Sequence, residues 1–287
     1  MSFLAVENLS ARVRGGPRLL RGVSLTVAAG EVRGLVGESG AGKSMIGKAI
    51  LGILPQAVEV TGGAIWLDGR DLLAMPGAER RRMIGAVAAL IPQDPLTALN
   101  PARRVGRQIT DRLVDLMGRT RAAAEARAVE LLAEVQIDNA ARVMRSYPHE
   151  LSGGMRQRIL IAAAFAAEPK LIVADEPTTA LDVTAQKTIL RLIAGMQARH
   201  GTALLFVTHD LGVVSKVCDR MTVLYGGKVV EDTGVRDFFR APAHPYAAAL
   251  LAATPKYTDP EGSLTPVPDT VVAGVRAEVA AWDAAHG

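Results

Sequence analysis

The chain has 287 residues, of which 49% are hydrophobic and only 4% aromatic, and it carries a formal net charge of +4. This length allows one large aliphatic core or two modest ones. No apolar run is long enough to span a bilayer and no signal-peptide pattern opens the chain, so we expect a protein that is soluble by itself. The basic residues are dispersed and few aromatics are available to stack on bases, which argues against a nucleic-acid binder.

A single cysteine, Cys218, excludes an internal disulfide and suits a reducing compartment. Within the apolar segment around it, we expect this residue to be a small buried side chain near a strand and not a nucleophile. With one cysteine and five dispersed histidines, the chain offers no ligand set at the spacing of a transition-metal site.

The N-terminal segment predicts an antiparallel hairpin. Residues 3–12 and 18–33 alternate apolar and polar side chains, and Gly15-Gly16-Pro17 separates them. Residues 64–67, followed by an Asp-Gly turn, predict a further strand of the same layer.

The residues Gly37-Glu38-Ser39-Gly40-Ala41-Gly42-Lys43-Ser44 fit the phosphate-binding pattern G-x-x-x-x-G-K-[ST] at every fixed position. An apolar strand (32–36) precedes them and a helix (45–54) follows. The glycines allow main-chain N–H groups to surround a phosphate at the positive end of the helix dipole. The expected nucleotide contacts here are Gly37, Ser39, Gly40, Gly42, Lys43 and Ser44. Lys43 supplies a cation for the outer phosphates and Ser44 a hydroxyl for Mg²⁺.

After a predicted buried strand at 87–91, which ends at Pro92-Gln93, the pattern changes to helical. We expect helices at 105–117 and 122–135, and a third helix, capped by Asp138, that runs to residue 146. The segment from about 95 to 167 therefore predicts an all-helical insertion in an α/β domain.

The insertion ends in Leu151-Ser152-Gly153-Gly154-Met155, just before a further helix. Ser152, Gly153 and Gly154 would expose a hydroxyl and main-chain N–H groups at the N-terminus of that helix. This arrangement predicts a second anion site on the same chain.

Two apolar runs end in polar side chains, as buried parallel strands do at the edge where ligands bind. The first, residues 171–174, delivers Asp175 and Glu176. Asp175 suits a ligand of Mg²⁺ and Glu176 a base or water-orienting group. The second, residues 203–207, leads to His209, although a lone histidine is more often structural.

Taken together, these motifs resemble an ATP-binding-cassette ATPase over nearly the whole chain. The phosphate loop, Gln93, LSGGM, "LIVADEP", Ala180-Leu181-Asp182 and His209 match the cassette's Walker A, Q-loop, signature, Walker B, D-loop and H-loop in order. The resemblance implies a P-loop NTPase with a mainly parallel core sheet, an antiparallel β subdomain and the helical insertion. It also implies ATP and Mg²⁺ as ligands, with Asp182 near the nucleotide and Gln93 near Mg²⁺.

A narrower resemblance is to the peptide/nickel importer branch. It rests on "QDPLTALNP" (93–101), "HELSGGMRQR" (149–158), "ADEPTTALDVTAQ" (174–186) and "HPYAAALL" (244–251). The methionine version of the signature, with Met155, resembles that of the D-type subunit of dipeptide and oligopeptide permeases. The implied organisation is an ATPase domain at 1–240 and a C-terminal extension at 241–287.

The chain departs from this branch in three places. The cassette usually places an aromatic residue against adenine, and the corresponding position here falls near Val13. Adenine stacking should therefore be weaker or come from elsewhere. The extension lacks the cysteine cluster found in many members, and we expect no iron–sulfur or metal centre in it. Its last part diverges: Pro260, Pro266 and Pro268 predict a stiff linker, and Asp269 is a possible cap of a short helix. The apolar face of that helix, which we expect to dock on a cassette, consists of Val271, Val272, Val275, Val279 and Trp282.

The resemblance implies the energy-coupling ATPase of a membrane importer. The expected partners are a second, homologous ATPase in a head-to-tail heterodimer, two transmembrane permease subunits and, indirectly, a solute-binding protein. Glu176 would act on the attacking water, His209 would sense the γ-phosphate, and Gln93 would report to the membrane subunits at the cytoplasmic face of the inner membrane. Peptide is the first candidate cargo, with nickel, metal chelates and opines as alternatives. A soluble cassette ATPase acting on nucleic acid or ribosomes ranks lower, and a P-loop kinase or GTPase leaves LSGGM and the D-loop unexplained.

Overall fold

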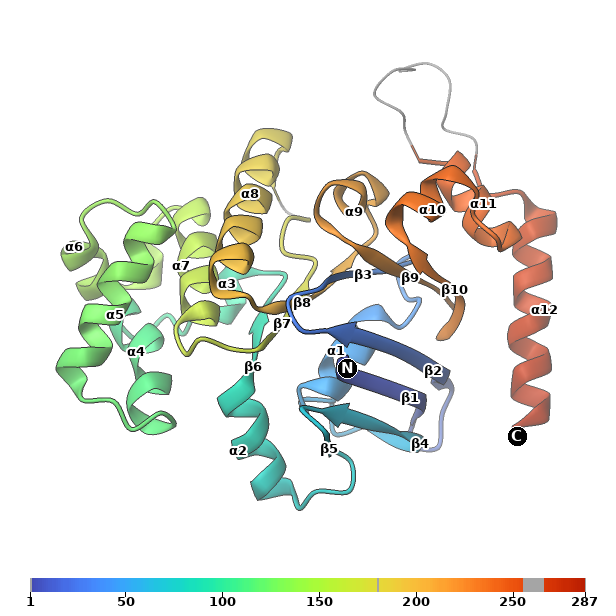
Figure 1. Ribbon diagram of the computed structural model, residues 1–287, viewed down its shortest axis with the longest axis horizontal. Coiled ribbons are helices and arrows are strands. Elements are labelled where there is room, and N and C mark those ends of the chain that lie inside the picture. Colours follow the sequence, from blue (N-terminus) through green and yellow to red (C-terminus); the bar gives the residue numbers. More distant parts are fainter. Residues whose placement is uncertain (1, 180, 255–265, 287) are drawn as a thin grey trace. The chain divides into compact units, whose positions relative to one another are not determined.

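Alternating apolar residues build the antiparallel sheet at the N-terminus. The computed structural model describes residues 2–179, 181–254 and 266–286. In it, β1 (Ser2–Val13) pairs antiparallel with both β2 (Arg18–Ala28) and β4 (Val58–Leu67) (Figure 1). β5 (Arg70–Asp71) completes the order β2-β1-β4-β5. The predicted hairpin is confirmed, and β4 begins six residues earlier than the strand expected at 64–67.

The described residues form two compact units. The first joins Met1–Met75 with Leu205–Gly287, and the second is Pro76–Leu204. The division of the chain at residue 240 remains a prediction.

A second, mixed sheet in the first unit carries the phosphate loop. Its strands follow the order β10-β9-β3-β8. β3 (Val32–Val36) runs parallel to β9 (Arg220–Tyr225), and β10 (Lys228–Gly234) runs antiparallel to β9. β8 (Ala203–Thr208) begins at the unit boundary. The helices that connect these strands are α1 (Lys43–Ile50), α9 (Leu211–Val217) and α10 (Val235–Arg240).

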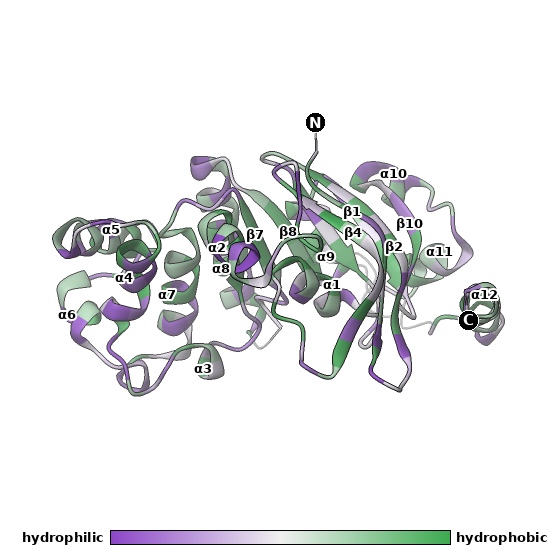
Figure 2. Cartoon of the chain, turned by 90° about the horizontal axis from the view of Figure 1, so that it is seen from below, coloured by the Kyte–Doolittle hydropathy of each residue, from purple (hydrophilic) through white to green (hydrophobic). Residues whose placement is uncertain are grey.

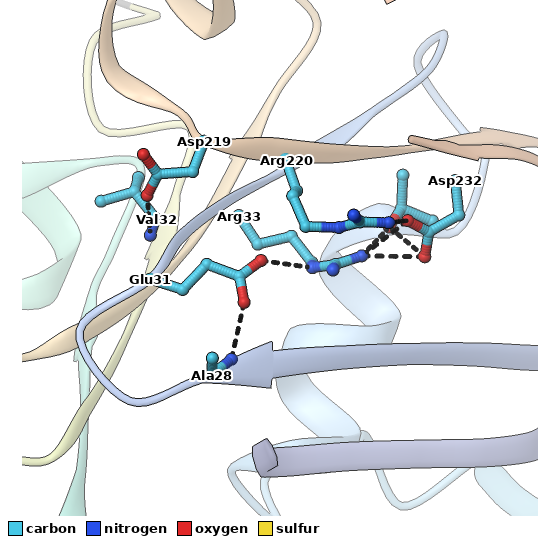
Figure 3. A network of polar contacts seen from close by, with 8 residues as sticks. Ala28, Glu31, Val32, Arg33, Asp219, Arg220 and Asp232 are labelled. Carbon is cyan, nitrogen blue, oxygen red and sulfur yellow. Dashed lines mark hydrogen bonds and ion pairs between the residues drawn. The ribbon is translucent and has the colours of Figure 1, made fainter. Parts of the chain in front are cut away.

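A buried arginine lies in the middle of this apolar core. Arg33 on β3 is 2% exposed, and its NH1 donates to both carboxylate oxygens of Asp232 at 2.8 Å (Figure 3). Its Nε donates to Glu31 at 3.1 Å, and Thr222 accepts a further bond from NH1 at 3.2 Å. A buried charge is tolerated only when it is paired in this way. The strand that enters the phosphate loop is therefore fixed laterally to β10 as well as to β9.

The second unit combines two parallel strands with helices. β6 (Ala88–Ile91) pairs parallel with β7 (Leu171–Asp175). β7 and β8 are apolar almost throughout, as Figure 2 shows, in keeping with burial on both faces. The helices are α2 (Gly77–Val87), α3 (Pro95–Ala98), α4 (Val105–Asp115), α5 (Arg121–Glu134), α6 (Ala140–Arg145), a 3₁₀ turn (Pro148–Glu150), α7 (Gly153–Phe165) and α8 (Val183–His200).

Among the expected boundaries in this unit, the start of a strand and the cap of a helix are each wrong by one residue. Val87 ends α2 instead of opening β6. Asn139, not Asp138, caps α6, and its side-chain oxygen accepts from the Arg142 N–H at 3.3 Å. Asn139 has a left-handed backbone with φ 54°, a conformation that asparagine adopts readily among residues with a side chain.

Two helices follow in the C-terminal region, α11 (Pro245–Ala252) and α12 (Asp269–Ala285). Val275 of α12 is 2% exposed and packs in a core cluster of the first unit. Further along α12, Val279 packs beside Gly226 and Trp282 beside Gly22. Each is so close that a side chain at the glycine would meet it. The predicted docking of the apolar face on the cassette is thus confirmed for the first unit.

The expected cap of α12 is wrong. Asp269 is the first helical residue, Pro268 occupies the N-cap position, and no side chain caps the helix there. Pro260 of the expected linker lies outside the described residues.

Candidate active site

The phosphate loop connects β3 to α1 and is shaped by close packing. A side chain at Gly37 would come within 2.3 Å of the Leu224 carbonyl oxygen on β9. One at Gly42 would come within 3.1 Å of the Leu19 carbonyl oxygen on β2. Both glycines have positive φ, 151° and 97°, which residues with a side chain rarely adopt. Neighbouring backbones therefore require glycine at these two positions.

Lys43 curls back over this loop. Its side chain is almost fully buried, and Nζ donates to the main-chain carbonyls of Gly37 at 2.8 Å and Glu38 at 2.9 Å. Ser39 and Gly40 lie exposed on the loop, and Ser44 stands in the first turn of α1. The loop combines a cation, exposed main chain and a helix N-terminus, and these groups fit an anionic oligophosphate.

Val13, near the position of the aromatic residue that stacks on adenine in the resembling family, is the last residue of β1. His209, which also belongs to the first unit, follows β8 directly and is exposed. Asp210 beside it caps α9 by accepting from the Val213 N–H at 3.1 Å. The histidine is thus held at the junction of a buried strand and a capped helix.

In the second unit, the ends of β6 and β7 bring Gln93 and Glu176 together. The two strands run parallel, so their carboxyl ends lie at one edge. Gln93 Nε2 donates to Glu176 Oε2 at 3.4 Å, and Thr179 Oγ1 donates to the same oxygen at 2.8 Å. Asp175, the last residue of β7, directly precedes Glu176 and is half-buried. Its carboxylate is a hard oxygen donor of the kind that Mg²⁺ prefers.

The backbone of Glu176 is strained. Its φ of 46° lies in the left-handed region, where a long side chain costs energy. Such strain is concentrated at functional sites because the surroundings must impose it. Thr179 was missed by sequence reasoning, and the only available signal was a hydroxyl three residues after the glutamate in "DEPTT".

The signature segment forms the N-terminus of α7. Ser152 caps the helix, with Oγ accepting from the Met155 N–H at 3.3 Å. Gly153 and Gly154 are exposed, and a side chain at either position would meet no atom within 4 Å. Open main-chain N–H groups at a helix N-terminus can bind an anion.

Gln157 ties this helix to the loop after Glu176. It is 1% exposed, and its Nε2 donates to the Pro177 carbonyl at 2.9 Å. Sequence reasoning did not assign Gln157 a role.

Asp182 in the same unit caps α8, and its Oδ1 accepts from the N–H groups of Thr184 and Ala185, each at 2.9 Å. In this structure its carboxylate therefore serves the helix.

Cys218 is an apolar packing residue, as predicted. It is largely buried, and a side chain at Gly34 would come within 3.2 Å of its Sγ. Burial, followed by the charge of Asp219, raises the pKa of the Cys218 thiol well above its ordinary value, so the reactive thiolate is disfavoured.

Among the residues that the structure describes, no three His, Cys, Asp or Glu side chains form a group suited to a metal ion. The expectation that the chain holds no transition metal remains a prediction. None of the described helices is both long and apolar enough to cross a bilayer.

Comparison with known proteins decides the family. The family model described as "ABC transporter" matches residues 20–179. This chain belongs to that family. It is an ATPase that binds ATP, with an α/β cassette fold.

Curated relatives extend the match beyond the cassette core. A probable peptide ABC transporter ATP-binding protein of Sinorhizobium fredii is 49% identical over 240 residues, 83% of this chain and 71% of that protein. The dipeptide transport ATP-binding protein DppD of Escherichia coli is 41% identical over 274 residues, 94% of this chain and 84% of that protein.

Solved cassettes share the fold. The structure of cbiO1 from Clostridium perfringens, part of the ABC transporter complex cbiONQ, has a TM-score of 0.73 at 26% identity and covers 83% of this chain and 91% of its own. A dimeric post-hydrolysis ATP-binding cassette bound to ADP and Pi has a TM-score of 0.71 at 25% identity, and covers 81% and 99%.

Proposed function

We propose that this ATPase is the energy-coupling subunit of a membrane importer for peptides, located at the cytoplasmic face of the inner membrane. The observation that carries the proposal is identity of 41–49% over 83–94% of the chain to proteins named for peptide or dipeptide transport. The "HPYAAALL" segment, which the importer branch shares, supports the same choice. Nickel, metal chelates and opines are the alternative cargoes.

In this proposal, the residues of the first unit bind the triphosphate. The ammonium of Lys43 moves from the loop carbonyls to the β- and γ-phosphates, and the loop amides from Gly37 to Gly42 supply hydrogen bonds. Ser44, Asp175 and Gln93 are the residues that would hold Mg²⁺. When bound, Mg²⁺ neutralises charge on the phosphate oxygens. His209 contacts the γ-phosphate.

Glu176 orients the water that attacks the γ-phosphate. Thr179 and Gln93 both donate to its carboxylate, so they fix its direction, and the left-handed backbone restricts it further. Gln93 also carries the state of the site towards the membrane subunits. Ser152, Gly153, Gly154 and Asp182 serve the nucleotide of a partner cassette across a head-to-tail dimer.

The proposed partners are a second, homologous ATPase, two transmembrane permease subunits and, through them, a solute-binding protein. Met155 favours a heterodimer, because its thioether is at best a weak acceptor where the cassette superfamily more often has a glutamine amide. The two composite sites are then chemically unequal. ATP closes the dimer and hydrolysis opens it, which shifts the membrane subunits between two conformations.

Purification of the chain from its native membrane tests the proposal. We expect two hydrophobic subunits and a second ATPase to co-purify, and peptide-loaded binding protein to stimulate ATP turnover in reconstituted vesicles. Stimulation by a nickel- or opine-loaded binding protein alone would change the cargo. Co-purification with ribosomes or nucleic acid in place of membrane subunits would refute the importer role.

A second measurement tests the heterodimer. The isolated chain should be largely monomeric and should hydrolyse ATP slowly at all concentrations, whereas addition of the mate and membrane subunits should restore turnover. A tight homodimer of the isolated chain that is as fast as the assembled complex would contradict the heterodimer.

A further inference from the structure

A tyrosine of the C-terminal region lies inside the core of the first unit. Tyr246, in the first turn of α11, is 0% exposed. Its N–H donates to His244 Nδ1 at 3.1 Å, which fixes the start of the helix. Its ring packs edge-on against Tyr225 on β9, with 4.8 Å between centroids and 67° between planes.

The same core reaches the phosphate loop. Tyr246 belongs to the buried cluster that contains Val36 of β3 and Val275 of α12. Val36 is the residue immediately before Gly37. Tyr246 therefore packs in one cluster with the strand end from which the loop departs and with the docked helix.

The hydroxyl of Tyr246 lies in this core without a partner: it is buried and has no hydrogen bond of good geometry within the described part of the chain. Burial and then the charge of Glu38 raise the pKa of Tyr246 far above its usual value, so the hydroxyl remains a proton donor at neutral pH. Glu38 follows Gly37 in the loop, and its carbonyl oxygen accepts from Lys43 Nζ at 2.9 Å. Glu38 is thus linked to Lys43 by a hydrogen bond and to Tyr246 by its charge.

We propose that Tyr246 is a positioning residue of the phosphate loop, which acts through Glu38 so that the C-terminal helices strengthen ATP binding without touching the nucleotide. The proposal rests on the loop's role in binding ATP. A hydroxyl fully removed from water gains by donating to the nearby carboxylate of Glu38. In the ATP-bound state, a hydrogen bond from the Tyr246 hydroxyl to Glu38 restricts the loop to the conformation in which Lys43 and the loop amides face the phosphates.

A purely structural role for the ring predicts a different result. Removal of a buried hydroxyl that makes no hydrogen bond leaves the folded state equally stable or stabilises it, and ATP affinity stays unchanged. The positioning role predicts that Tyr246→Phe weakens ATP binding although the thermal midpoint does not fall. Affinity and stability therefore separate the two roles.

The test measures equilibrium binding of ATP with Mg²⁺ to the full-length isolated chain, together with its thermal midpoint. For Tyr246→Phe we expect a Kd increased about 3- to 10-fold, the typical net effect of one hydrogen bond. Tyr225→Phe is the matched control: it makes the same change in the ring stacked on Tyr246, and its hydroxyl accepts from Arg276 at 3.2 Å instead. Its Kd should stay within twofold of that of the wild type. A Kd for Tyr246→Phe equal to that of the wild type would overturn the proposal.

A double-mutant cycle tests the route through Glu38. If the hydroxyl acts on this residue, Glu38→Ala with Tyr246→Phe should bind ATP no more weakly than Glu38→Ala alone. Additive losses would overturn the route. Lys43→Ala reports separately on the loop: if it binds ATP as the wild type does, or if the wild type does not bind, the loop's role in ATP binding fails instead.

Discussion

Arg21 on β2 and Asp283 on α12 form a bidentate ion pair. Arg21 Nε donates to Oδ1 at 2.9 Å, and NH2 donates to Oδ2 at 2.8 Å. The remaining nitrogen, NH1, donates to the Gly226 carbonyl at 2.6 Å. Because Gly226 lies in the turn between β9 and β10, one guanidinium joins the antiparallel sheet, that turn and the C-terminal helix.

We expect Asp283→Asn to loosen α12. The amide cannot accept both hydrogen bonds of the guanidinium, and a charge-assisted pair of this geometry is stronger than an ordinary surface pair. Asp283 is 36% exposed, so solvent screening reduces the expected loss in the free energy of unfolding to about 1 kcal/mol. Fluorescence of Trp282, in a Trp66→Phe background, during urea unfolding measures it.

Asp237→Asn provides the control for that variant. Asp237 and Arg240 form an i,i+3 pair whose side chains are 66% and 80% exposed, so the change should stay within about 0.5 kcal/mol. Equal effects of the two substitutions would show that the Arg21 pair does not hold the helix.

Acid should release the same helix. Hydrogen bonding from Arg21 lowers the pKa of Asp283, and hydrogen bonding from Lys228 lowers the pKa of Glu278, which also contacts His244 at 3.0 Å. A depressed folded-state pKa contributes stability that is complete above the unfolded values, near 4, and is lost as the pH falls through the lower folded values. Trp282 fluorescence should therefore report undocking below about pH 4. The Asp283→Asn chain should show a smaller pH dependence, and an unchanged profile would contradict this origin.

Glu176→Gln should keep ATP binding but nearly abolish turnover in the assembled complex. The amide preserves the shape of the side chain but loses the carboxylate that orients or activates water, which is worth about 10²–10⁴-fold in rate. Turnover within a few-fold of the wild type would rule out this role. Thr179→Val should cost less, since Gln93 still donates to the carboxylate.

Lys43→Ala should weaken ATP binding itself. The substitution removes a cation from the ground-state complex, whereas Glu176→Gln affects the reaction step. A direct titration of ATP on the isolated chain distinguishes the two, because it does not depend on turnover. Unchanged affinity would exclude Lys43 from ground-state binding.

The sequence predicted those features that depend on local pattern. The phosphate loop, the signature and the acidic strand end lie between elements whose apolar period is visible, so their positions at strand and helix ends could be inferred. Helix caps at Asn139 and Pro268 were each missed by one residue, because the backbone angle of a single position decides them.

Contacts that join distant parts of the chain were not predictable. Gln157 is bound to a carbonyl 20 residues away, and Tyr246 packs in one cluster with Val36, some two hundred residues earlier in the chain. Nothing in the composition around either residue indicates its partner. Only the tertiary fold turns a glutamine on a helix or an aromatic ring in "HPYAAALL" into part of the site.

The ion pair between the buried Arg33 and Asp232 constrains how this chain can diverge. Its members are 199 residues apart in the chain, and only the arginine is buried, so loss of Asp232 leaves the 2% exposed Arg33 with Glu31 as its remaining carboxylate partner. Replacement of Arg33 by an apolar residue of similar volume removes the buried charge altogether. Loss of the carboxylate at position 232 is therefore disfavoured while Arg33 remains, and positions 33 and 232 should co-vary among relatives.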